Sequence, residues 1–72
     1  MSFALTATEV ACGVTVAEVE RYAARSLVMP SGKVVVDDVA PALAGAVAKL
    51  RLGGEVEFLG FNILGLPVYG RR

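Results

Sequence analysis

The chain has 72 residues, of which 56% are hydrophobic and 19% are charged, and its seven basic residues balance its seven acidic ones. This length suits one domain, near the size at which a single core supplies only a few kcal/mol, so self-association or a partner would help to cover the apolar surplus. The balanced charge excludes a basic arm of the kind that binds nucleic acid.

The residue types exclude further kinds of site. One cysteine and no histidine rule out an internal disulfide and a cysteine-based metal cluster, and they remove the usual partners of a zinc ion or a nucleophile. The chain also lacks a glycine-rich phosphate loop. We therefore expect a protein that is not an enzyme and that carries no metal and no cofactor.

The hydropathy pattern predicts a soluble protein. No basic stretch followed by an apolar run indicates a signal peptide. The most apolar run, residues 58–69, is too short to cross a bilayer and is interrupted by glycine, asparagine and proline. We expect a cytoplasmic location, or a place in a virion if the protein is viral.

Two helix starts of the same design follow each other near the N-terminus. In each, a threonine hydroxyl can accept a hydrogen bond from a free backbone N–H group. The carboxylate of a glutamate three residues later can accept one from the backbone N–H of the threonine. The two pairs are Thr6 with Glu9, and Thr15 with Glu18. They predict two short helices, roughly at residues 7–12 and 16–25.

The segment "CGVT" predicts a tight turn between these helices. Gly13 stands where the backbone needs a positive φ, and Cys12 before it is most simply a small buried apolar group. After Pro30, "SG" turns the chain into "KVVV", whose β-branched residues favour a strand.

A third helix is expected next, capped by Asp37 or Asp38 and carrying Pro41 in its first turn. Its apolar residues recur at helical spacing and form one face, which comprises Val39, Leu43, Ala46, Val47 and Leu50. Two glycines, Gly53 and Gly54, end the helix.

The C-terminal segment "EVEFLGFNILGLPVYGRR" alternates at first like a half-buried strand, and "LPVYG" could return beside it with Pro67 restricting that strand to an edge. If Val56 and Phe58 face the core, the apolar residues that follow them cannot all point inward. Two alternatives remain open: an extended tail that docks on a partner, or a hairpin folded back on the third helix.

The segments "TATEVACGVTVAEVERY", "SLVMP" and "DDVAPALAGAVAKLRLGG" together resemble the N-terminal domain of the MerR family and its relatives, which include phage excisionases and the chaperone modulator CbpM. The resemblance covers residues 5–53. It implies a small winged helix-turn-helix-like domain of the α+β class, mainly helical, in residues 1–54. Residues 55–72 would follow as a β-hairpin or extended apolar tail.

The surface of the second helix departs from the DNA-binding members of such families. These members usually present arginine or lysine to the phosphates, whereas this chain has Ala17, Glu18, Glu20 and Arg21. The wing-like segment adds only Lys33. Because attraction to phosphate supplies most of the non-specific affinity, the two glutamates would oppose binding.

Two functions therefore remain open. In the first, the chain is a small interaction module, an adaptor, a modulator or a phage assembly or inhibitor protein, that binds a protein partner or itself through Glu18, Glu20, Leu59, Phe61, Ile63 and Leu64. In the second, it is a winged helix-turn-helix regulator or an excisionase-type protein that contacts double-stranded DNA through Thr15, Arg21, Arg25 and Lys33. We expect neither a membrane nor a small-molecule substrate as a partner.

Overall fold

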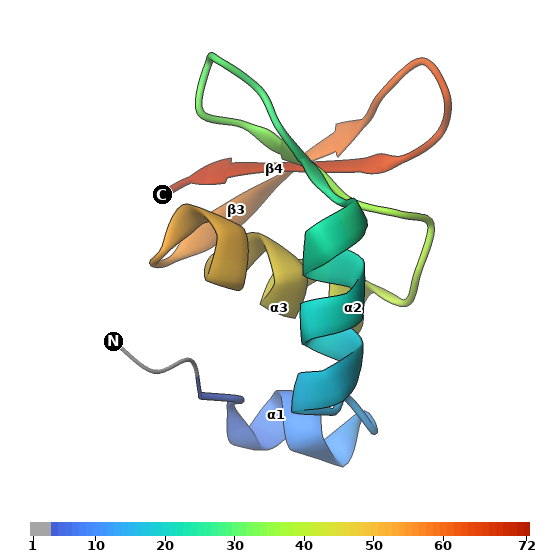
Figure 1. Cartoon of the computed structure of the whole chain (residues 1–72), viewed down its shortest axis with the longest axis vertical. Helices are drawn as coiled ribbons and strands as arrows, with labels where there is room; N and C mark the ends of the chain where they lie inside the picture. The colour runs from blue at the N-terminus through green and yellow to red at the C-terminus, as the bar shows by residue number, and fades with distance from the viewer. Residues whose placement is uncertain (1–3) are drawn as a thin grey trace.

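A computed structural model describes residues 4–72 as three helices and a four-stranded antiparallel sheet. The elements are α1 (Ala7–Ala11), α2 (Val16–Arg25), β1 (Leu27–Val28), β2 (Val34–Val35), α3 (Pro41–Leu52), β3 (Val56–Phe61) and β4 (Pro67–Arg71). In Figure 1, α1 lies at one end of the molecule, and two hairpin turns diverge at the other end. The α+β class expected from the sequence is confirmed.

The caps of α1 and α2 follow the predicted design, with one difference. At α1, the Thr6 hydroxyl accepts from the Glu9 N–H at 3.2 Å, and the Glu9 carboxylate accepts from the Thr6 N–H at 2.8 Å. At α2, Thr15 accepts from the Glu18 N–H, but the Glu18 carboxylate accepts from the Thr15 hydroxyl and not from its backbone. Gly13 between the helices has the expected positive φ of 84°.

The start of α3 differs from the prediction, and its end does not. The N-cap is Ala40, whose side chain makes no capping hydrogen bond, and Pro41 occupies the first turn. The prediction that Asp37 or Asp38 caps the helix was wrong, because the helix begins only at Pro41. Asp37 forms an ion pair with Arg25 of α2. At the other end Gly53 adopts the left-handed conformation at φ 74° and stops the helix.

The sheet has the order β1-β2-β4-β3, and two rows of paired residues run across it on opposite faces. One row consists of Val28, Val34, Tyr69 and Phe58, and its central members are buried against α3. The other row consists of Leu27, Val35, Val68 and Gly60. Leu27 and Val28 in β1 were not predicted as a strand.

The C-terminal segment is a hairpin that joins the sheet, which settles the choice between a hairpin and an extended tail. Its second strand, β4, lies between β2 and β3, so the prediction that Pro67 restricts this strand to an edge was wrong. Pro67 is the first residue of β4, where its missing N–H costs little. Its carbonyl accepts from the Val36 N–H at 3.0 Å, so Pro67 takes part in both pairings of β4.

The core lies between α3, α2 and the inner face of the sheet. The predicted apolar face of α3 is confirmed, because Leu43, Ala46 and Val47 are buried and Val39 and Leu50 pack at its margin. Tyr69 is buried in the same cluster, and burial raises the pKa of its hydroxyl. Cys12, predicted to be buried, is exposed, because α1 ends at Ala11 and Cys12 lies at its C-cap in the turn.

A buried ion pair joins α1 to α3. The Glu9 side chain is almost inaccessible, and its second carboxylate oxygen lies 2.7 Å from Lys49 Nζ. Burial alone would raise the pKa of the Glu9 carboxyl. The hydrogen bonds from Lys49 and from the Thr6 N–H, with the positive charge of Lys49, outweigh burial and lower that pKa below its usual range.

Candidate interaction surface

Exposed large apolar side chains gather on the C-terminal hairpin. Five residues of β3 and the turn after it form what we call the hairpin patch: Phe58, Leu59, Phe61, Ile63 and Leu64. The exposed fraction is 68% for Phe61, 100% for Ile63 and 77% for Leu64. The hairpin patch contains all four apolar residues that the sequence proposed for partner binding, and it adds Phe58.

The turn that carries Ile63 and Leu64 is held by its own hydrogen bonds. The side-chain oxygen of Asn62 accepts from the N–H groups of Leu64 at 3.0 Å and Leu66 at 2.9 Å. Gly65 allows the turn to close with a φ of 80°. Figure 1 shows this turn, between β3 and β4, projecting away from the three helices. The two aliphatic side chains therefore stand on a defined, protruding tip.

An apolar groove of about 480 Å³ lies beside the hairpin patch. One wall comes from the start of α3 and the segment before it, and the other from the hairpin. The lining residues are Asp38, Val39, Pro41, Ala44, Phe58, Phe61, Pro67 and Tyr69. This volume falls within the range of about 300–1,000 Å³ that is usual for binding pockets. Asp38 is the only charged residue in the lining.

Three aromatic rings form the hairpin wall of the groove. The Phe58 ring lies 5.3 Å from that of Phe61 and 5.4 Å from that of Tyr69, in both cases edge to face. Tyr69 is anchored in the core, while both phenylalanines are at least half exposed. Sequence reasoning missed this wall, since the rings meet only after β3 pairs with β4.

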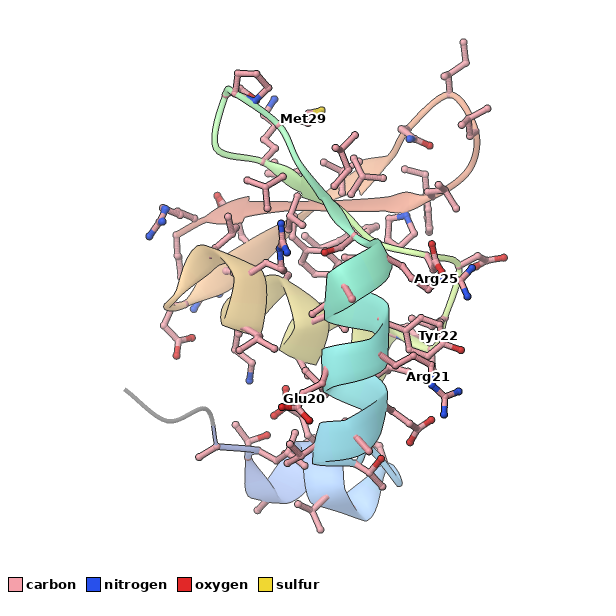
Figure 2. All side chains as sticks on the ribbon, in the orientation of Figure 1. Glu20, Arg21, Tyr22, Arg25 and Met29 are labelled. Atoms are coloured by element: carbon pink, nitrogen blue, oxygen red, sulfur yellow. The ribbon has the colours of Figure 1, made fainter. Side chains whose placement is uncertain are left out.

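The exposed surface of α2 carries its two glutamates on different sides, since Glu18 and Glu20 are two residues apart on the helix. Figure 2 shows Arg21, Tyr22 and Arg25 pointing to one side of the helix and Glu20 pointing to another. Glu18 is engaged with Thr15. The glutamates that the sequence proposed for partner binding therefore do not form one acidic face.

The glutamates of α2 also lie apart from the hairpin patch. Glu20 in Figure 2 lies on the half of α2 nearer to α1, whereas the β3–β4 turn is at the opposite end of the molecule. The structure therefore separates the two sets of residues that the sequence assigned to one partner-binding surface.

The residues proposed for DNA contact are also partly engaged. Arg25 Nε lies 2.8 Å from the carboxylate of Asp37, and its guanidinium lies 5.9 Å from the centre of the Tyr22 ring. Thr15 is the N-cap of α2. Lys33 belongs to the β1–β2 turn, and Met29 of the same turn lies across the molecule from Arg21 in Figure 2. Arg21 and Arg25 therefore lie on one side of the molecule, and Lys33 adds no third positive charge to that side.

The outer row of the sheet adds a second apolar surface. Leu27 is exposed, and Val35 and Val68 are half-buried on the face that α3 does not cover. Leu59 lies over Gly70 on this face, where an added Cβ would come within 2.9 Å of it. Sequence reasoning did not identify this surface because β1 was not predicted.

Within residues 4–72, no group of three His, Cys, Asp or Glu side chains is placed to hold a metal ion. None of the helices described is long and apolar enough to cross a bilayer. Comparison with protein-family models, with curated proteins and with solved structures finds no match.

Proposed function

We propose that the protein is a small, non-enzymatic interaction module that docks on a protein surface, either a partner or a second copy, through the hairpin patch. The observation that carries the proposal is the concentration of exposed Phe, Leu and Ile side chains on one projecting hairpin beside an apolar groove. The largest apolar patch on a typical monomeric protein measures about 300–600 Å² and is often functional. A cytoplasmic or virion-associated adaptor, modulator or assembly protein would suit this role.

The size of the hairpin patch decides whether docking can be stable. A fully exposed Leu or Ile offers on the order of 100 Å² and an aromatic side chain about 200 Å², so the exposed fractions leave about 450 Å² to be covered. At about 25 cal/mol per Å², complete burial contributes at most about 11 kcal/mol, because buried area converts only partly into affinity. Association costs about 4–15 kcal/mol. A partner therefore has to cover most of the patch, and single contacts at its margin do not suffice.

The scaffold is proposed to be a MerR-like winged helix-turn-helix. This part of the proposal is supported by the element order, in which two capped helices with a glycine turn precede the short β1–β2 hairpin and α3. In such a scaffold α2 would be the second helix of the helix-turn-helix and the β1–β2 hairpin would be the wing.

A second function, DNA binding by α2, is favoured by one observation: Arg21 and Arg25 point to the same side of the helix (Figure 2). It is opposed by the pairing of Arg25 with Asp37 and by the carboxylate of Glu18, which precedes Arg21 by three residues and therefore lies on the same side of the helix. We therefore place it second.

The test measures retention on mixed duplex DNA across a salt series, with static light scattering on the same sample. The interaction module is expected to show no retention and to have a mass above one chain, or to capture a partner that the Leu64→Asp and Phe61→Asp variants lose. Val10→Asp is the matched control because Val10 is also an exposed apolar residue, 59% accessible, but belongs to α1.

A regulator would give a different result. DNA retention that falls steeply with salt, is abolished in the Arg21→Ala, Arg25→Ala double variant and is unchanged in Leu64→Asp would establish the second function and reject the first. Equal assembly or equal partner capture by Leu64→Asp and the parent would also reject the role of the hairpin patch.

A further inference from the structure

The protruding tip and the groove belong to the same surface of the chain. Phe61 lines the groove, and the tip residue Ile63 follows it after only one intervening residue. From Phe58 to Gly70 the chain contains no charged residue. The tip therefore carries no charge of its own into the groove, where removing one from water would be costly.

We propose that the first occupant of the groove is the tip of a second copy, so that two chains exchange Ile63 and Leu64 around a two-fold axis. Because each chain presents both a groove and a tip close together, one axis satisfies both contacts at once and the assembly closes as a dimer. This inference rests on the proposed function and specifies its partner.

The area available supports a weak dimer. Without Leu59, which lies on the opposite face of the sheet, the hairpin patch offers about 400 Å² per copy, or about 800 Å² in all. A standard interface buries about 800 Å² per partner, and interfaces below about 1,200 Å² in all are weak and transient. We therefore expect a dimer that forms at concentrations on the order of 100 µM.

Pairing of two β3 edges is a less suitable way to join two copies. The strand is interrupted between Phe58 and Gly60, where the register shifts and leaves Leu59 as a bulge. Glu57, exposed on the same strand, would bring like charges together in a two-fold pair. Bulges and charges are the usual devices that prevent edge-to-edge association.

The test is a complementation experiment with one tip variant and one groove variant. Ile63→Asp places a carboxylate on the tip, and the side chain it replaces is fully exposed, so the single chain should fold normally. Pro41→Arg places a long cation on the groove wall at an exposed position in the first turn of α3. Val10→Asp is again the control, and far-UV circular dichroism establishes that all variants fold.

The masses are measured by static light scattering at about 10–500 µM, a range that brackets the expected dissociation constant. The mean mass of the parent and of Val10→Asp should rise with concentration from near one chain toward two, and Ile63→Asp and Pro41→Arg alone should remain near one. Their equimolar mixture should recover the dimer, because it combines one unaltered tip and groove with one Asp–Arg contact.

Either of two results would overturn the inference. A parent that keeps the mass of one chain up to 500 µM excludes a second copy as the occupant. The proposed function then requires a different protein partner. A dimeric parent whose two variants fail to complement each other excludes the exchange of tips, but it leaves docking through the hairpin patch in place.

Discussion

The ion pair between Glu9 and Lys49 gives the sharpest prediction about stability. Lys49→Met keeps most of the apolar stem but removes the ammonium group, and leaves the Glu9 carboxylate buried with only the Thr6 N–H as a donor. Breaking a fully buried pair costs about 3–5 kcal/mol, and losing one hydrogen bond to a charged group costs about 1.5–3. Because Lys49 is partly solvent-accessible, water can replace some of the lost interaction, and we expect a loss of about 2 kcal/mol at pH 7.

Thermal unfolding followed by circular dichroism measures this loss. In a domain of this size about 1 kcal/mol lowers Tm by about 4–8 °C, so the expected decrease is about 8–16 °C. The folded-state pKa of Glu9 is lowered. Its contribution is therefore complete above the unfolded pKa of about 4.3 and is lost as the pH falls through the folded-state pKa. The difference between parent and variant should shrink progressively below about pH 4.

A double-mutant cycle with Glu9→Gln separates the pair from the packing of each side chain. The coupling between the two substitutions should account for most of the loss at pH 7. Equal melting temperatures for the parent and Lys49→Met at pH 7, or a difference that stays the same at pH 3, would refute the reasoning.

Three further predictions follow from single groups. Gly53→Ala forces an alanine into the left-handed region at φ 74° and should cost about 1–2 kcal/mol in urea unfolding, whereas Gly54→Ala, which has no positive φ, should be nearly neutral. Because burial raises the pKa of Tyr69, its contribution to stability is complete below about pH 10 and declines as the pH rises through the folded-state pKa; Tyr69→Phe should reduce this alkaline loss. If α2 binds DNA, Asp37→Asn should release Arg25, and the slope of log K against the logarithm of the salt concentration should steepen by about 0.9. An unchanged slope would exclude Arg25 from the contact.

Features fixed by a few neighbouring residues could be predicted from the sequence. Thr6 with Glu9 and Thr15 with Glu18 marked both helix starts, because each cap is made by residues three apart. Gly53 marked the end of α3, since the left-handed conformation depends on the residue itself. The exposure of the apolar residues after Phe58 could be foreseen from their number alone.

Features that depend on distant pairing could not be predicted in this way. Asp37 was expected to cap α3, but Arg25, twelve residues earlier, lies close enough to bind it. Pro67 was expected at an edge, but the order β1-β2-β4-β3 places it beside β2 as well as β3. The groove was missed for the same reason, because its walls come from the start of α3 and from the hairpin.

The sizes of the buried and exposed side chains give a further reason to regard the hairpin patch as an interface. Among residues 4–72, the largest fully buried side chains are all valines, and alanines of α3 fill much of the remaining core. The larger Phe, Leu and Ile side chains of β3 and its turn stay outside. Each of them would contribute about 1.5–3 kcal/mol if it were fully buried, which is a large fraction of the stability of so small a domain. A chain that leaves this free energy unused in the monomer can recover it only when another surface covers the hairpin.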